Sequence, residues 1–237
     1  EMGAEQLAMR MLSSQGQIDG YKIRNCGGER HMLNAFYTID EQEYTSEIIE
    51  KKSRFIALLV NVENEAEAIS IIEKTRKMHR EARHNVFAYR IANVLERCSD
   101  DGEPSGTAGI PILDILRGEN LQNVLVIVTR YFGGILLGTG GLVRAYSTAA
   151  KQAISLAKKI EMKLSNEYEI TVDYNFNNIL QHYFKTERIH ISQISFSEKV
   201  SISIIVDTEK SQNITDPIIE KTEGTAKVKL KGTYYHK

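Results

Sequence analysis

The sequence of 237 residues contains no tryptophan, three prolines and two cysteines, Cys26 and Cys98. Two cysteines are too few for a disulfide framework or a cysteine-based metal cluster, so we expect a reducing, cytoplasmic environment. Three prolines do not make a proline-rich linker. No apolar run approaches the roughly 20 residues that a membrane span requires, and we expect no membrane partner. Because the formal net charge is −1, any contact with nucleic acid depends on a local patch of cations.

What is present is the composition of an ordinary soluble globular protein, with 42% hydrophobic and 26% charged residues. The length allows one large or two small domains. Residues 1–31 show no sustained periodicity and lack the apolar core of a signal peptide. The hypothesis is that Met32 is the true start and that residues 1–31 are a leader; the alternative is a genuine, poorly ordered arm. The expected domains are then 32–161 and 162–237.

Hydrophobic periodicity predicts an α+β fold. In the first domain we expect strands within 43–62, 86–91 and 124–128, helices over 63–79, 110–117 and 142–159, and a turn-rich loop over 98–109. In the second domain we expect strands and helices in the order β-α-β-β-α-β, over 167–173, 176–184, 189–196, 199–206, 216–222 and 227–235. This is the order of a ferredoxin-like split βαβ unit, and Asp216 is expected to cap its second helix.

Five glycines follow the predicted strand 124–128: Gly133, Gly134, Gly138, Gly140 and Gly141. A strand, a glycine turn and a helix N-terminus expose backbone N–H groups to an anion. The spacing is not a Walker A loop, because Thr139 stands where lysine is needed, nor a dinucleotide fingerprint, because Val143 replaces the third glycine. It is closer to the glycine-rich turn of small-molecule kinases, which holds a triphosphate. The alternative is that the glycines only permit positive φ and close packing of strand against helix.

A second segment, from Asp100 to Gly109, is rich in turn-forming residues, which is typical of a surface loop. Its three carboxylates are also groups that bind a divalent metal or act as acid and base. Its hydroxyl side chains would donate to a phosphate or cap the helix that follows. Nothing in the sequence places a base beside Ser105, so no nucleophile–base pair is visible. The residues concerned are Asp100, Asp101, Glu103, Ser105 and Thr107.

Cations are frequent from Arg76 to His84 and recur at Arg130 and Arg144. Near a helix C-terminus, such cations complement the helix dipole. Beside the two loops, Arg83, His84, Arg130 and Arg144 would instead contact phosphates. The neighbouring aromatic residues would either stack on bases or fill the core; they are Tyr89, Tyr131, Phe132 and Tyr146.

Three lysines, Lys227, Lys229 and Lys231, alternate along the last predicted strand. In a ferredoxin-like sheet this strand lies at an edge, where lysines prevent edge-to-edge pairing. An RNA-binding sheet would need exposed aromatics on its central strands. Tyr168 and Phe196 do not make that case.

The longest motifs resemble the IMPACT family, and in particular its bacterial YigZ-like two-domain members. The resemblance rests on His84-Asn85, on DDGEPSGTAGIPIL at 100–113, on RYFGG at 130–134 and on LGTGGLVRAY at 137–146. It extends from about Phe36 to the C-terminus. Residues 1–31 have no counterpart in it.

The resemblance implies that the N-terminal domain has the fold shared by a small-subunit ribosomal protein domain, domain IV of elongation factor G and the small-molecule kinases. It implies a C-terminal domain similar to the ferredoxin-like end domain of elongation factor G. Eukaryotic members regulate translation by binding an activator of a kinase that acts on an initiation factor. They carry a different domain in place of this C-terminal half. No reaction is assigned to the two-domain members.

We therefore expect a non-enzymatic cytoplasmic binding protein that acts in translation regulation, with RNA or a ribosome-associated factor as partner. We expect no cofactor, apart from an Mg²⁺ held between the loop carboxylates and a phosphate ligand. One alternative is an enzyme acting on a phosphorylated small molecule or nucleotide at the glycine loop. Another is a protein–protein interaction module that uses the surface from Arg130 to Tyr146. The residues expected to contact the ligand are Arg83, His84, Arg130, Tyr131, Gly133, Gly134, Gly138, Gly140, Gly141, Arg144 and Tyr146.

Overall fold

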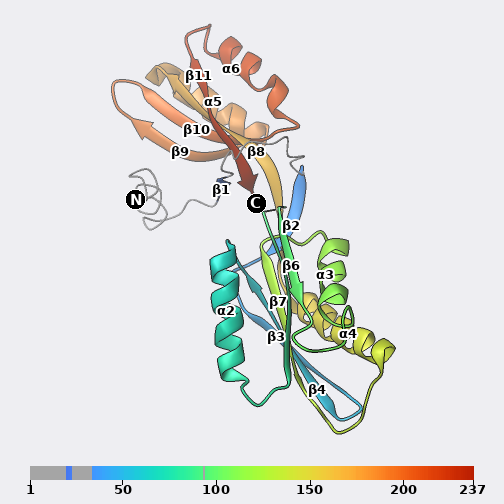
Figure 1. Ribbon diagram of the computed structural model, residues 1–237. Coiled ribbons are helices and arrows are strands. Elements are labelled where there is room, and N and C mark those ends of the chain that lie inside the picture. The colour runs from blue at the N-terminus through green and yellow to red at the C-terminus, as the bar shows by residue number, and fades with distance from the viewer. Residues whose placement is uncertain (1–19, 23–33, 93) are drawn as a thin grey trace. The chain divides into compact units, whose positions relative to one another are not determined.

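The computed structural model describes residues 20–22, 34–92 and 94–237 (Figure 1). The described chain divides into two compact units. One unit spans Phe36–Met162, and the other contains Lys163–Lys237 with the described residues before Phe36. The division falls inside one strand, β8 (Lys159–Val172), within which the sequence also predicted a domain boundary, between residues 161 and 162. The leader hypothesis concerns residues that lie outside the described part of the chain, apart from 20–22.

The Phe36–Met162 unit is built on an antiparallel sheet with the strand order β3-β4-β7-β5-β6. Its strands are β3 (Tyr44–Glu50), β4 (Ser53–Asn61), β7 (Val124–Tyr131), β5 (His84–Ile91) and β6 (Leu95–Ser99). The central strand β7 is buried from Val124 through Arg130. A strand that is buried on both faces has a continuous run of apolar residues, and this run predicted the strand from the sequence.

Helices cover both faces of this sheet, and successive residues of β7 serve two different cores. Val124, Val126 and Val128 face α3 (Gly109–Gly118) and α4 (Thr139–Leu156) in the larger core. Leu125 and Ile127 face α2 (Glu65–Met78) in the smaller one. This alternation follows from the two-residue period of side chains along a strand.

Glu96, on the edge strand β6, connects this strand to α3. Its carboxylate accepts hydrogen bonds from Arg90 Nε at 2.7 Å and from Arg117 Nη2 at 2.6 Å. Burial acts to raise the pKa of Glu96, but the hydrogen bonds from Arg117 and Arg90 outweigh it and leave the pKa below its ordinary value. The carboxylate is therefore stabilised in its charged form.

The second unit confirms the predicted order β-α-β-β-α-β and the antiparallel ferredoxin-like sheet, with strand order β11-β8-β10-β9. Its further elements are α5 (Tyr174–Thr186), β9 (His190–Phe196), β10 (Val200–Asp207), the 3₁₀ turn η1 (Ser211–Asn213), α6 (Thr215–Lys221) and β11 (Lys227–His236). A short strand, β1 (Gly20–Lys22), pairs with Tyr234–His236 of β11. The three lysines of β11 precede this paired stretch.

Several sequence expectations need correction. Strands β2 (Ala35–Ile39) and β6 were not predicted, and the last two residues of β6, Cys98 and Ser99, were expected in a loop. Helix α4 ends at Leu156, three residues before the expected end. Asp216 is not a cap, because α6 begins one residue earlier and places Asp216 in the first turn. The α+β class is confirmed. Among the described residues, no helix combines the length and apolar character needed to cross a bilayer.

Candidate functional site

Three connections meet at one end of the Phe36–Met162 unit, which we call the loop end (Figure 1). They are the β3–β4 turn with Lys51 and Lys52, the α2–β5 connection with Arg83, and the β7–α4 glycine loop over 132–138. The sheet register brings them together, because Arg54 pairs with Tyr131 and His84 pairs with Arg130. The Arg83 amide also donates to the Arg130 carbonyl at 3.1 Å.

The glycine loop combines both roles that its sequence allowed. A Cβ at Gly133 would lie 2.0 Å from the carbonyl carbon of Lys52, so this glycine permits close packing of two backbones. Gly134 and Gly138 have φ of 85° and 73°, which side chains rarely adopt, and both are exposed. Gly140 is exposed and Gly141 half-buried in the first turn of α4. The loop is therefore pinned at Gly133 and open from Gly134 to Leu136.

Asp100 organises the loop between β6 and α3. Its Oδ1 accepts from the amides of Ala108 and Gly109 at 3.0 and 2.8 Å, and its Oδ2 accepts from the amide of Gly106 at 2.8 Å. A carboxylate at a helix N-terminus satisfies amides that have no partner inside the helix. Asp100 is thus the side chain that caps α3, the role that the sequence suggested for Ser105 or Thr107. Thr107 is buried and its hydroxyl donates to the Pro104 carbonyl, while Ser105 is exposed.

Asp101 attaches the same loop to the start of β5. Its Oδ2 accepts a hydrogen bond from the backbone amide of Asn85 at 2.7 Å, and its Oδ1 accepts from Nη2 of Arg76 at 2.6 Å. Its carbonyl lies 2.8 Å from Nδ1 of His84. Because a carbonyl only accepts, His84 carries its proton on Nδ1 in this arrangement.

Glu103, Arg130 and Tyr146 form a buried polar cluster below the glycine loop. Glu103 Oε1 accepts from Arg130 Nη1 at 2.5 Å and from the Tyr146 hydroxyl at 2.8 Å. Nε2 of His84 lies 3.8 Å from the same oxygen. Burial raises the pKa of the Tyr146 hydroxyl, and the charge of Glu103 adds to the effect. The hydroxyl therefore stays protonated and donates.

This cluster changes the roles expected for its members. Arg130 was expected to contact phosphate, but it is 5% exposed and paired with Glu103. Of the two roles expected for Tyr146, base stacking or filling the core, the structure shows the second, because Tyr146 is fully buried and packs edge-on against Phe55. Tyr89 is buried as well. A buried ion pair needs its partners, because removing one leaves an uncompensated charge.

Tyr131 and Phe132 lie at the surface of the loop end. The Tyr131 hydroxyl is 2.8 Å from Nδ1 of His79, which joins β7 to the end of α2. Phe132 is 40% exposed, and the guanidinium groups of Arg83 and Arg130 each lie 5.6 Å from its ring centre. Arrangements of this kind are attractive cation–π contacts.

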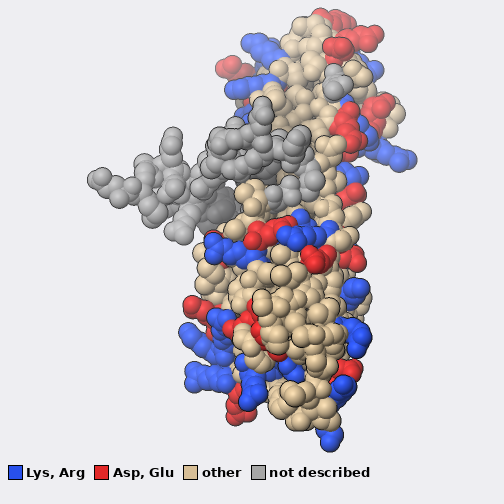
Figure 2. Space-filling view, turned by 45° about the vertical axis from the view of Figure 1, so that its right-hand side comes forward, with Lys and Arg blue, Asp and Glu red and all other residues tan. Residues whose placement is uncertain are grey.

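Four exposed cations lie on the elements next to the glycine loop: Lys51 and Lys52 in the β3–β4 turn, Arg83 before β5 and Arg144 in the second turn of α4. None of them forms an ion pair with another residue in the described part of the chain. Exposed carboxylates at Glu50 and Glu81 adjoin them in the chain. Figure 2 shows Lys and Arg side chains around the lower end of this unit, beside an uncharged area.

Sequence reasoning missed two features of the loop end. One is the lysine pair, which occupies the left-handed region at φ of 45° and 65° in the tight β3–β4 turn. The other is an apolar tip on the glycine loop, formed by Phe132, Ile135 and Leu136, with Leu136 83% exposed. The signal in the sequence was three consecutive apolar residues, 135–137, between glycines, of which only Leu137 enters the core.

Chemistry at the carboxylates is restricted by the contacts that they already make. Among the described residues, no group of three or more His, Cys, Asp or Glu side chains has the arrangement of a metal site. Burial raises the pKa of the Cys98 thiol, and the charge of Asp100 adds to this, so the thiol is not an activated nucleophile.

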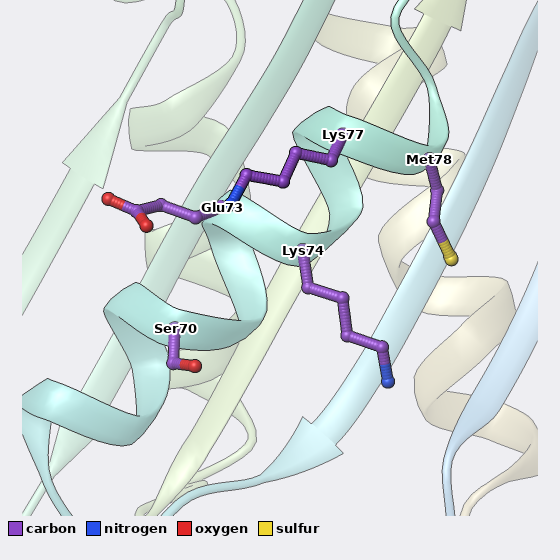
Figure 3. Close-up of a pocket in the computed structure, with 5 residues that line it drawn as sticks. All are labelled: Ser70, Glu73, Lys74, Lys77 and Met78. Carbon is purple, nitrogen blue, oxygen red and sulfur yellow. The ribbon is translucent and has the colours of Figure 1, made fainter.

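A separate surface hollow runs along α2 (Figure 3). Ser70, Glu73, Lys74, Lys77 and Met78 line it, all from this one helix. None of these residues belongs to the loop end or to the predicted site.

Comparisons with known proteins identify the chain's relatives. The family model "Impact N-terminal domain" matches residues 51–154. The chain is 35% identical over 200 residues to "IMPACT family member YvyE" of Bacillus subtilis, and the alignment covers 84% of this chain and 92% of that protein. The chain belongs to the IMPACT family. It is also 39% identical over 130 residues to "IMPACT family member YigZ" of Escherichia coli, covering 53% of this chain and 63% of that protein.

A solved structure supports the fold of this IMPACT family member. The structure, described as that of an hypothetical protein, aligns with a TM-score of 0.55 at 27% identity and covers 83% of this chain and 97% of its own. The resemblance that the motifs indicated is thereby confirmed. The Impact N-terminal match begins at Lys51 and contains every residue named above at the loop end except Glu50.

Proposed function

We propose that this IMPACT family member is a non-enzymatic cytoplasmic binding protein that acts in translation regulation, with RNA as the ligand of its loop end. The observation that supports RNA is a set of exposed cations that form no ion pair with any described residue, Lys51, Lys52, Arg83 and Arg144, on the elements next to an open glycine loop. Cations neutralise phosphates, and glycines allow a backbone to approach closely. The role in translation rests on the family membership.

The positions of the carboxylates favour binding over catalysis. Both oxygens of Asp100 and of Asp101 accept hydrogen bonds from amides or a guanidinium group, and Glu103 is paired inside the protein. A general base must reach its substrate, and a metal ligand must offer an oxygen to the ion. Catalysis by these carboxylates would require breaking the hydrogen bonds that hold this loop in place.

The test is binding to purified bacterial ribosomes and to a structured RNA, each titrated with salt. Four phosphate contacts would give a slope of log K against log salt of about −3, since each contributes roughly 0.7 to 0.9. Arg144→Glu should weaken binding and reduce the slope by about one contact. Lys151→Glu is the matched control, because Lys151 lies on the same helix, is exposed, and is about 10 Å further along it. No binding to either probe at low salt would refute the proposal.

A protein partner is the second candidate function, and the exposure of Ile135 and Leu136 favours it. In that case nuclease treatment would leave a ribosome-associated complex intact, and Arg144→Glu would still weaken it. Loss of the complex on nuclease treatment would instead support RNA.

A further inference from the structure

The apolar tip of the glycine loop is unusual for a surface loop. Phe132, Ile135 and Leu136 are 40%, 41% and 83% exposed within five positions of the chain. Single exposed apolar residues are common and need no explanation. Exposed apolar residues grouped on one loop are a feature of surfaces that bind a partner.

The tip is also held in place. Gly133 packs against the backbone of Lys52, and the Gly133 amide donates to Ser53 Oγ at 3.2 Å. On the far side, Leu137 is buried in the larger core. The three residues between these anchors, Gly134, Ile135 and Leu136, are thus presented to solvent by a loop that is fixed at both ends. Binding through a preorganised loop loses less conformational entropy.

The charges around the tip indicate the chemistry of its partner. The elements next to it carry four exposed cations, Lys51, Lys52, Arg83 and Arg144, and two exposed carboxylates, Glu50 and Glu81, adjoin these cations in the chain. An anionic exterior with an apolar interior is the construction of a nucleic-acid helix, whose phosphates lie outside its stacked bases. Proteins that bend DNA insert Leu, Ile or Phe side chains between base steps while cations contact the groove and backbone, and the same chemistry applies to an RNA helix whose stack is already opened.

We propose that Leu136, supported by Ile135, is a wedge that enters an opened base step of a bulged RNA helix while the four cations hold its phosphates. This inference rests on the proposed RNA binding. Aliphatic side chains offer no stacking platform for a single strand, so the gain comes from filling the space between two separated bases. Opening a step costs a few kcal/mol in a regular helix, and a bulge has already disrupted the stack.

The test uses an RNA hairpin with one unpaired nucleotide and 2-aminopurine beside it, because this base fluoresces more strongly when it is unstacked. Binding of the full chain should raise the fluorescence. Leu136→Ser should remove most of the rise and weaken binding roughly tenfold, without changing the salt slope. Leu156→Ser is the matched control, since Leu156 is 57% exposed at the end of α4 and outside the tip. Ile135→Ser provides a second variant with the same expected direction.

Three results would overturn the wedge. Binding to the hairpin without a rise in fluorescence would refute the wedge but not the proposed RNA binding. Weaker ribosome binding by Leu136→Ser with unchanged hairpin binding would assign the tip to a protein partner. Absence of RNA binding at low salt would remove the proposed function and the wedge together.

Discussion

Replacing Gly133 by alanine tests the packing that fixes the loop end. The new Cβ would lie 2.0 Å from the carbonyl carbon of Lys52, 2.1 Å from its oxygen and 2.4 Å from the Ser53 nitrogen. Reaching a separation of 3.0 Å from that carbon requires a displacement of about 1 Å, and the atoms that must move are backbone rather than a flexible side chain. Overpacking usually costs about 1–3 kcal/mol, and we expect the upper end of this range, about 3 kcal/mol.

Thermal unfolding followed by circular dichroism measures this effect, and the expected fall in Tm is about 10 °C. Gly140→Ala is the control, because a Cβ at this position would meet no atom within 4 Å apart from its chain neighbours and its own helix backbone, and the residue is in the first turn of α4. Alanine there should leave Tm unchanged or raise it slightly, since glycine is the weaker helix former. Equal melting temperatures for Gly133→Ala and the unsubstituted protein would refute the close packing.

Three further substitutions test the polar contacts of the same unit, each by urea denaturation. Asp100→Ala should destabilise it by about 2–3 kcal/mol, because three amides lose their acceptor; a loss near zero would contradict the cap. Tyr146→Phe should cost about 1–2 kcal/mol, since Glu103 loses a buried donor, and a neutral result would count against the cluster. Glu96→Gln should cost about 1 kcal/mol at pH 7. In the folded protein the pKa of Glu96 is lowered from 4.5. The difference in unfolding free energy between the unsubstituted protein and Glu96→Gln should therefore be complete above pH 4.5 and disappear as the pH falls below the folded pKa. An unchanged difference in acid would contradict the ion pairing of Glu96.

The helices and strands were largely predictable because their signals are local. The buried run 124–128, the helical spacing after the glycine loop and the β-α-β-β-α-β order of the second unit all appeared in the sequence. The errors fell where signals are weak. Strand β6 has no fully buried residue, so it carries little apolar periodicity, and it ends inside the turn-rich segment. The cap of α3 was missed because Asp100 lies eight residues before Ala108, beyond the usual capping distance.

The candidate site was predictable in position but only partly in composition. Arg83 and Arg144 are exposed, whereas Arg130 and Tyr146 are buried with Glu103. In the sequence, Arg130 and Arg144 look equivalent, since both flank the same glycines. Their difference arises because Arg130 is on the central strand and Arg144 is on the outer face of α4.

The sequence by itself determined most of the strands and helices, where the glycine loop lies, and which family the chain resembles, because periodicity and motifs are properties of neighbouring residues. Only the tertiary structure decided which cations remain available to a ligand. Glu103 meets an arginine 27 residues away and a tyrosine 43 residues away, and no local rule selects those partners. Burial removes the water that would otherwise stabilise each charge, so the fold must supply a counter-charge wherever it encloses one.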